Sequence, residues 1–223
     1  MALSNSALQI RAYLFKGVLV IPDGTEHIPP YAYENRHDIT CVRLPDTCLR
    51  IGVGAFKGCK NLVDIHFATR CHLKSIDDNA FAGCSGIINL HLPDMLQSIG
   101  ENVFDGCSGI VDLYLPDMLQ SIGRGAFAGC SGITDLKLPN ALKSIGIGAF
   151  KWCSGIVDLH LPNTLQSIGD RAFQGCSGIV DLHLPDTLQS IGNGAFRDCS
   201  GIVALHLPDT LQSIGDCAFS GCS

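Results

Sequence analysis

The sequence predicts a solenoid, that is, one elongated domain in which copies of a short unit stack on one another. Three observations predict it: a phenylalanine recurs about every 23 residues, each unit holds one apolar-polar alternation, and proline and glycine follow at fixed offsets. The recurring residues are Phe56, Phe81, Phe104, Phe127, Phe150, Phe173, Phe196 and Phe219. A fixed period of this length is typical of repeat architectures, so we expect one continuous hydrophobic core.

The first half of each unit carries the pattern of a strand. In the unit that begins at residue 179, Leu182 and Leu184 alternate with Asp181 and His183, as in a strand with one buried face. Pro185 follows and ends the strand, because proline cannot donate a hydrogen bond to a sheet. Stacked units should therefore form a parallel sheet along one side of the solenoid.

The second half of each unit predicts shorter structures. Residues 188–191 are expected to form a second short ladder with the neighbouring units. Gly192 suits a turn with positive φ, and residues 193–198 are long enough for one helical or 3₁₀ turn. The side opposite the sheet should consist of such turns.

The chain divides into three stretches. Residues 1–16 form an N-terminal extension, 17–38 a degenerate unit, and 39–223 eight units of which the last is truncated. Irregular terminal units shield the end of a solenoid core, which is the role expected for 17–38. No comparable cap is evident in the last unit, so either the natural protein continues or a partner covers this end, of which end-to-end self-association is one form. The second unit carries two extra residues at 69–72, which should form a loop.

Composition excludes several function classes. The formal net charge is −6 and the pI about 5.7, without a basic cluster, which argues against nucleic-acid binding. No apolar run approaches the roughly 18 residues of a membrane-spanning helix. Polar residues interrupt the stretch from 2 to 17, which therefore does not resemble a secretory signal. These features favour a cytoplasmic chain that does not insert into membranes.

The cysteines follow the repeat. Of the 12 cysteines, eight recur once per unit: Cys59, Cys84, Cys107, Cys130, Cys153, Cys176, Cys199 and Cys222. Such a column is expected to line the core in the reduced state. There is no CxxC pair, which excludes zinc-finger and thioredoxin-like sites. Outside the column, Cys41 and Cys71 are the best candidates for exposed, reactive thiols.

The repeated string itself resembles a known pattern. Leu-x-Leu-Pro-x-x-Leu-x-x-Ile-Gly-x-x-Ala-Phe-x-x-Cys, found over about residues 18–222, is similar to the BspA-like class of leucine-rich repeats. The resemblance implies an α/β solenoid, a right-handed coil with one parallel sheet on its concave face and short turns or 3₁₀ helices on its convex side. It also implies adhesion or protein recognition at cell surfaces. It carries no catalytic residue onto this chain.

The outward positions of the predicted sheet form two stripes, one rich in aspartate and one in histidine. Together they make the expected partner-binding surface: Arg43, Asp64, His66, Asn89, His91, Asp112, Tyr114, Asp135, Lys137, Asp158, His160, Asp181, His183 and His206. In the middle, Tyr114 and Lys137 replace histidine, so this part is chemically distinct. Tyrosine is a frequent anchor at protein interfaces.

We therefore expect a non-enzymatic scaffold that binds another protein or a glycoprotein, without a cofactor, a metal or catalytic residues. Repeated side chains offer repeated environments, whereas catalysis requires one distinct desolvated pocket. Two alternatives stay open: a self-stacking module, and a metal- or pH-responsive surface on the histidine and aspartate stripes. Trp152 replaces a glycine of other units and is expected on the outer side as a second contact point.

Overall fold

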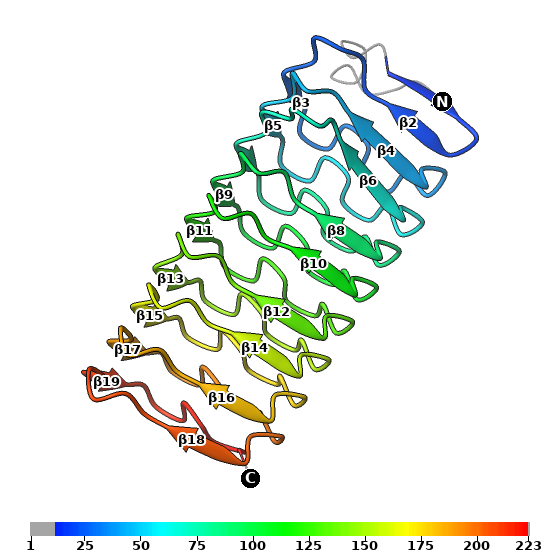
Figure 1. Cartoon of the computed structure of the whole chain (residues 1–223). Helices are drawn as coiled ribbons and strands as arrows, with labels where there is room; N and C mark the ends of the chain where they lie inside the picture. Colours follow the sequence, from blue (N-terminus) through cyan, green and yellow to red (C-terminus); the bar gives the residue numbers. More distant parts are fainter. Residues whose placement is uncertain (1–11, 223) are drawn as a thin grey trace.

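The structure, a computed structural model, describes residues 12–222 and consists of one stack of coils in sequence order (Figure 1). The first and last coils lie at opposite ends of the stack. Residues 12–222 contain 19 strands and no helix, and hence no helix that could cross a membrane. The predicted solenoid is confirmed.

The first strand of each coil belongs to one face of the stack, and we call these the face strands. They are β2 (Val18–Val20), β4 (Cys41–Leu44), β6 (Asp64–Phe67), β8 (Asn89–His91), β10 (Asp112–Tyr114), β12 (Asp135–Lys137), β14 (Asp158–His160), β16 (Asp181–His183) and β18 (Ala204–His206). Where neighbours pair, they pair in parallel and in register, as Leu182 does with Leu205. At the N-terminal end β1 (Tyr13–Phe15) adds one antiparallel strand to β2. Residues 1–11 of the predicted N-terminal extension lie outside the described part.

A second set of short parallel strands follows the bend after each proline. These short strands are β3 (His27–Ile28), β5 (Arg50–Ile51), β7 (Ser75–Ile76), β9 (Ser98–Ile99), β11 (Ser121–Ile122), β13 (Ser144–Ile145), β15 (Ser167–Ile168), β17 (Ser190–Ile191) and β19 (Ser213–Ile214). The isoleucines of the short strands from β3 to β17 point into the core, as Ile51 does with an exposure of 0%, whereas Ile214 of β19 is exposed. The second ladder predicted over 188–191 is thereby confirmed.

The third side of each coil consists of consecutive turns rather than helices. The backbone N–H of Phe127 donates to Ala149 of the next coil at 2.8 Å, and Phe150 donates to Ala172 at the same distance. Gly194 and Asp198 have φ values of +59° and +61°. A 3₁₀ helix needs φ of about −50° to −70° throughout, so these residues prevent one. The predicted 3₁₀ helices, and with them the α/β class, are wrong for residues 12–222.

The glycine after each short strand was predicted to adopt a positive φ, but it is needed because the neighbouring coil lies close to it. Gly192 is not among the residues with positive φ, in contrast to Gly194 two positions later. A Cβ atom at Gly192 would lie 2.4 Å from the backbone nitrogen of Asp170 in the preceding coil. Glycine therefore sets how closely the coils approach one another here.

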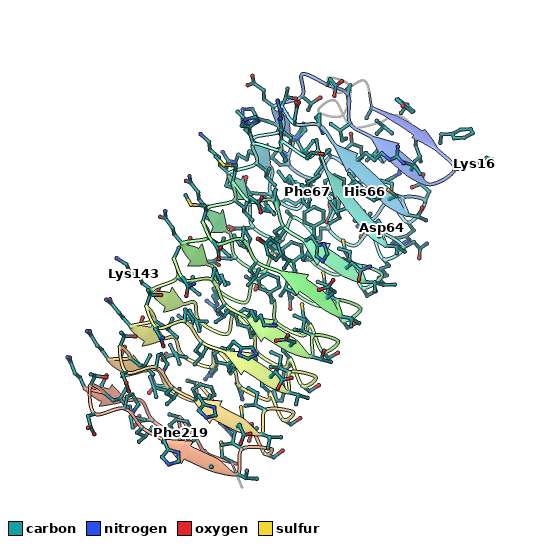
Figure 2. The ribbon with its side chains drawn as sticks, in the orientation of Figure 1. Lys16, Asp64, His66, Phe67, Lys143 and Phe219 are labelled. Carbon is teal, nitrogen blue, oxygen red and sulfur yellow. The ribbon has the colours of Figure 1, made fainter. Side chains whose placement is uncertain are left out.

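The core consists of columns of identical side chains. Consecutive phenylalanine rings stack with centroids 5.1 to 5.5 Å apart, for instance Phe56 on Phe81 and Phe81 on Phe104. Tyr33 extends the column into the degenerate unit, 5.2 Å from Phe56. Offset-stacked rings add favourable contacts beyond the burial of their area. Figure 2 shows the side chains that fill the interior between the three sides of the stack.

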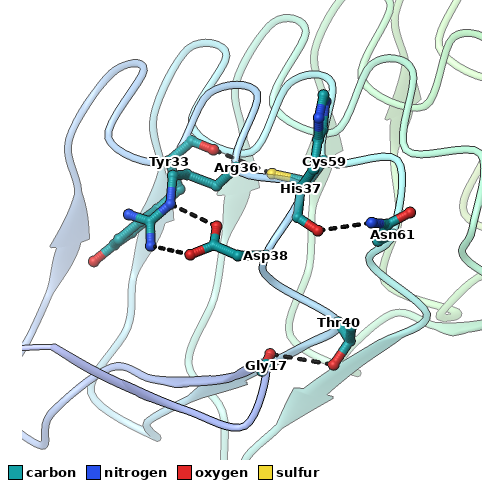
Figure 3. A network of polar contacts seen from close by, with 8 residues as sticks. All are labelled: Gly17, Tyr33, Arg36, His37, Asp38, Thr40, Cys59 and Asn61. Carbon is teal, nitrogen blue, oxygen red and sulfur yellow. Dashed lines mark hydrogen bonds and ion pairs between the residues drawn. The ribbon is translucent and has the colours of Figure 1, made fainter.

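Polar contacts join residues 17–38 to the next coils (Figure 3). Within this unit the Arg36 guanidinium makes two hydrogen bonds of 2.7 Å to Asp38. Asn61 Nδ2 donates to the carbonyl of His37 at 2.7 Å, and Thr40 Oγ1 donates to that of Gly17. Burial raises the pKa of Tyr33 to about 12, against the opposing charge of Arg36. The degenerate unit thus packs on the stack like the other coils.

The face-strand ladder is interrupted at regular places. Ladder pairing is missing between β6 and β8, between β10 and β12, and between β14 and β16. The short strands pair from β3 to β11 and again from β13 to β19. The boundary between the coil of β10 and β11 and the coil of β12 and β13 therefore lacks both strand ladders. The turn-side hydrogen bonds continue across it, as from Phe127 to Ala149.

Candidate functional site

The face strands place the predicted stripes outward. In β16 the leucine is 3% exposed and both flanking residues are exposed, and β8, β10, β12 and β14 repeat this pattern. The alternation expected from the sequence is confirmed. Asp64 and His66 of β6 lie on this face near the N-terminal end (Figure 2). The same face carries the other predicted surface residues: Arg43, Asn89, His91, Asp112, Tyr114, Asp135, Lys137, Asp158, His160, Asp181, His183 and His206.

A hollow of about 820 Å³ lies at the interruption between β10 and β12. Its lining includes His91, Asp112, Tyr114, Asp135 and Lys137. These are the residues with which the sequence sets the centre of the face apart. The structure thus brings the two irregular residues, Tyr114 and Lys137, together with regular stripe residues around one concavity. We call this concavity the central groove.

Two close polar pairs line the central groove, one between β8 and β10 and one within β12. His91 Nε2 lies 2.8 Å from Asp112 Oδ2, and Lys137 Nζ lies 2.6 Å from Asp135 Oδ2. His160 Nε2 approaches the same Asp135 at 3.5 Å. The hydrogen bond to Asp135, and next the charge of that carboxylate, raise the pKa of Lys137. All of these side chains are at least 46% exposed, so the pairs are solvent-screened contacts.

Tyr114 stands beside two carboxylates that the sequence did not single out. Its hydroxyl donates to Asp94 Oδ1 at 3.5 Å, and its ring lies edge-on to His91 with centroids 6.3 Å apart. Partial burial, followed by the charges of Asp94 and Asp117, raises the pKa of Tyr114. Both aspartates follow the proline of the repeat and line the groove. Because other units carry aspartate at the same position, the sequence offered no reason to single out these two.

A second hollow of about 470 Å³ continues the central groove toward the N-terminal coils. It shares His91 and Asp94 with the first hollow and is also lined by Arg70, His72 and Met95. The inserted residues 69–72 therefore form one wall of it. The inserted residues and the central residues of the face strands come from different coils. They nevertheless line one continuous surface.

The remaining aspartate and histidine residues of the stripes do not converge on one site. Asp158, His160, Asp181 and His183 line a separate hollow of about 400 Å³ at the interruption between β14 and β16. In the described chain no three side chains of the metal-binding types are placed to hold one ion together. The geometry therefore gives the metal alternative no support.

The cysteines lie partly where they were expected. The seven recurring thiols from Cys59 to Cys199 are buried, and Cys222 is half-buried. Cys71 is only 5% exposed, so its prediction as an exposed thiol is wrong: the inserted segment turns its cysteine inward. Cys41 is half-buried, and burial followed by the charge of Asp64 raises the pKa of its thiol. The exposed cysteine is Cys217.

Trp152 lies on the turn side and is 49% exposed, as predicted. Its φ is +63°, and a Cβ at Gly175 in the next coil would meet its ring at 2.1 Å. Lys151 Nζ lies 5.5 Å from the ring centroid. The indole therefore covers the neighbouring coil with one face and offers the rest to solvent.

The pattern of the BspA-type leucine-rich repeat region, in six copies, matches residues 26–157 and 120–223. No curated protein matches the sequence. A leucine-rich repeat protein from Bacteroides ovatus superposes with a TM-score of 0.74 at 25% identity, covering 92% of this chain and 59% of that one. This chain thus spans less than two thirds of that neighbour.

Two further solved structures resemble the chain. The T. pallidum leucine-rich repeat protein has a TM-score of 0.57 and 25% identity, covering 91% of this chain and 89% of its own. The pneumococcal vaccine antigen PcpA has a TM-score of 0.54 and 19% identity, covering 90% of this chain and 65% of its own. The likeness to PcpA concerns the fold alone.

Proposed function

The chain belongs to the BspA-type leucine-rich repeat proteins, and we propose that it is a non-enzymatic scaffold that binds another protein, or a glycoprotein, across its face strands. Extended solenoid faces with outward residues that differ from coil to coil are commonly used in recognition. The partner-binding surface includes all the outward residues predicted from the sequence, and the central groove is its principal site.

The observation that carries this proposal is the coincidence of irregular sequence with concave shape. Tyr114 and Lys137 replace the histidine that most units, including the one with His91, carry at this position. All three side chains line the 820 Å³ hollow. Tyr114 is 46% exposed, so a large aromatic surface is available for burial by a partner. Anchors of this type in concave, central positions dominate the energetics of protein interfaces.

Catalysis fits the groove poorly. General acid-base chemistry relies on carboxylates and imidazoles whose pKa values burial and neighbouring charges move apart. Here the side chains of His91 and Asp112 are 62% and 60% exposed and are paired with each other. Water therefore solvates the groups that an enzyme would have to desolvate.

The experiment compares partner capture by two double variants. Tyr114→Ala with Lys137→Ala removes the groove anchors, whereas His183→Ala with His206→Ala changes the same stripe outside the groove. Proteins cross-linked to each chain are quantified by mass spectrometry, after circular dichroism has confirmed equal folding. We expect the groove variant to lose partners that the control variant retains. Equal retention by both variants would exclude the groove as the principal site.

A second candidate, end-to-end self-association, rests on the last coil. Leu205, Leu207 and Ile214 are 38%, 46% and 47% exposed, whereas the equivalent Leu182 and Ile191 are 3% and 2% exposed. A second copy stacked on this end would bury these side chains. Sedimentation at increasing concentration tests it: self-association raises the mean mass, and Leu207→Lys should abolish that rise. A constant monomer mass would eliminate this candidate.

A further inference from the structure

The carboxylates of the groove are not balanced by cations. Asp112 and Asp135 are paired with His91 and Lys137. Asp94 and Asp117 also line the groove, and neither forms an ion pair within residues 12–222. The lining of the groove therefore holds two exposed carboxylates without an ion-pair partner.

An aromatic ring lies next to these two charges. Tyr114 donates its hydroxyl to Asp94, and Asp117 lies near enough for its charge to act on the same hydroxyl. The ring is 46% exposed to the hollow. A planar guanidinium can stack on an aromatic face and donate hydrogen bonds to carboxylates at its edge, which a spherical ammonium does less well.

The rest of the groove suits the aliphatic stem of a long cationic side chain. Val111 lines the hollow and is 51% exposed, whereas the leucines that border it on the three coils are 2 to 9% exposed. Arginine buries its methylene groups on such surfaces while its head stays with charged partners. An isolated metal cation would gain nothing from these apolar walls.

The dimensions of the surface indicate an extended segment rather than a lone side chain. The joined hollows reach from the coil of β6 to that of β12, which is three coil spacings of about 4.8 Å, or roughly 14 Å. Four or five extended residues, at about 3.3 Å each, span that length. Arg70 borders one end and Lys137 the other, so a cationic residue is attracted to the middle and repelled from both ends.

We propose that the central groove binds an extended segment of a partner protein that carries an arginine at its centre, with the guanidinium against Asp94, Asp117 and the ring of Tyr114. This inference rests on the proposed scaffold function and specifies the chemistry of the partner. The backbone of the segment lies along the groove, across the interruption between β10 and β12. Residues on either side of the arginine are small or apolar, as the exposed Val111 and Met95 favour.

The test uses short capped peptides as probes. The pentapeptide Gly-Val-Arg-Val-Gly is titrated into the labelled chain to about 5 mM, a range in which nuclear magnetic resonance detects weak binding. A second peptide holds citrulline, which keeps the shape of arginine and lacks its charge. We expect shifts of the backbone amides of Asp94, Tyr114 and Asp117, and affinity at least tenfold lower for the citrulline peptide. Added salt should weaken the arginine peptide selectively.

Variants of the chain distinguish the effect of the Asp94 and Asp117 carboxylates from that of negative surface charge in general. Asp94→Asn and Asp117→Asn should each weaken the arginine peptide severalfold. Asp186→Asn, at the same repeat position outside the groove, should leave it unchanged. Tyr114→Phe should retain binding, because the ring remains, and Tyr114→Leu should reduce it.

The outcomes distinguish this inference from the proposed function. Equal affinity for both peptides, or equal effects of the variants Asp94→Asn and Asp186→Asn, would overturn the arginine specificity. If the Tyr114→Ala, Lys137→Ala variant then still lost its cross-linked partner, the scaffold function would stand with a partner of different chemistry. Absence of peptide shifts together with undisturbed partner capture would refute both.

Discussion

A single recurring residue, the cysteine of each coil, joins the core to the backbone of the coil before it. Cys130 Sγ donates to the carbonyl of Phe104 at 3.2 Å, and Cys153 donates to that of Phe127 at 3.1 Å. These carbonyls lie in the turn segment, where no helix supplies the regular partners. The thiol is small enough for the column and still able to donate. The cysteine therefore recurs both because it fills the core and because its thiol donates a hydrogen bond.

Cys130→Ala should destabilise the chain by about 1 to 2 kcal/mol, because it leaves a small cavity and removes one of the two hydrogen bonds that the Phe104 carbonyl accepts, the other coming from the backbone N–H of Cys107. Urea unfolding measures the difference. Cys130→Val removes the donor and adds one methyl group to a fully buried site, so it should stay less stable than the parent chain. Cys217→Ala, at an exposed site, should stay within about 0.5 kcal/mol. Full stability of the valine variant would show that the thiol hydrogen bond contributes nothing.

The same thiols make stability depend on alkaline pH. Burial raises the pKa of Cys107, Cys153 and Cys199 from 9.0 to about 12. Below pH 9 folded and unfolded chains both keep these protons, so the stabilisation is fully present. As pH rises from 9 toward 12 the unfolded chain loses them first, and stability falls by up to about 1.4 kcal/mol per pH unit for each thiol.

Urea midpoints between pH 8 and 10.5 test this dependence. The parent chain should lose stability steadily above pH 9. The fall per pH unit should be smaller in Cys153→Ala, by the contribution of one thiol. If the stability of the parent chain and of the variant fell with pH at the same rate, the Cys153 thiol would ionise as readily in the folded chain as in the unfolded chain.

At the scale of the element, the glycine that ends each short strand determines the approach of neighbouring coils. A Cβ at Gly192 would meet backbone atoms of Asp170 and Gly169 at 2.4 and 2.6 Å. Backbone atoms cannot move aside as the end of a flexible side chain can. The turn glycine Gly148 differs, because its Cβ would meet only Lys151 Cβ, at 3.9 Å, while its φ is +60°.

Gly192→Ala should therefore cost more stability than Gly148→Ala. For Gly148→Ala only the positive φ is unfavourable, which costs about 1 kcal/mol. For Gly192→Ala the coils must separate, and we expect a loss of about 2 to 4 kcal/mol. Thermal unfolding of the two variants gives the comparison. A larger loss for Gly148→Ala would mean that backbone conformation, rather than coil spacing, dominates.

The elements differ in how well the sequence predicts them. Period-2 alternation around Leu182 fixed the face strands, since a strand side chain has only two directions to choose from. The turn segment was misjudged because Trp152, Arg171 and Asp198 occupy positive φ without being glycine. The signal lay in the alignment of the units, because glycines with positive φ, such as Gly129 and Gly148, occupy the same positions in other coils. Cys71 was misjudged because an inserted segment can turn back and bury its own cysteine.

For the whole molecule, the boundary between the coils of β10 and β12 is the distinctive feature. Neither strand ladder crosses it, although the turn-side hydrogen bonds do. The sequence located the unusual residues Tyr114 and Lys137 here but not the groove around them. Spacing between coils depends on the packing of every column at once, so no local pattern encodes it. The adjoining Asp94 and Asp117 acquire their importance only from this shape.

This boundary should also be where the stack opens most readily. In a solenoid, stability is approximately a sum of unit and neighbour terms, so a boundary without strand ladders has a weaker coupling. Hydrogen exchange followed by mass spectrometry measures it. We expect amides of β12 and β13 to exchange about tenfold faster than those of β15 and β17, whose ladder continues on both sides.

The control for this prediction is the turn side of the same coils. The amides of Phe127 and Phe150 both donate to the next coil at 2.8 Å, so they should be equally protected. Fast exchange at both would indicate loosening of a whole coil rather than of its strand side. Equal protection of β13 and β17 would mean that core packing alone couples the two halves, since the phenylalanine rings Phe127 and Phe150 stack across the boundary at 5.3 Å. An arginine peptide bound across β10 and β12 should slow the exchange of β12, because it holds both sides of the interruption together.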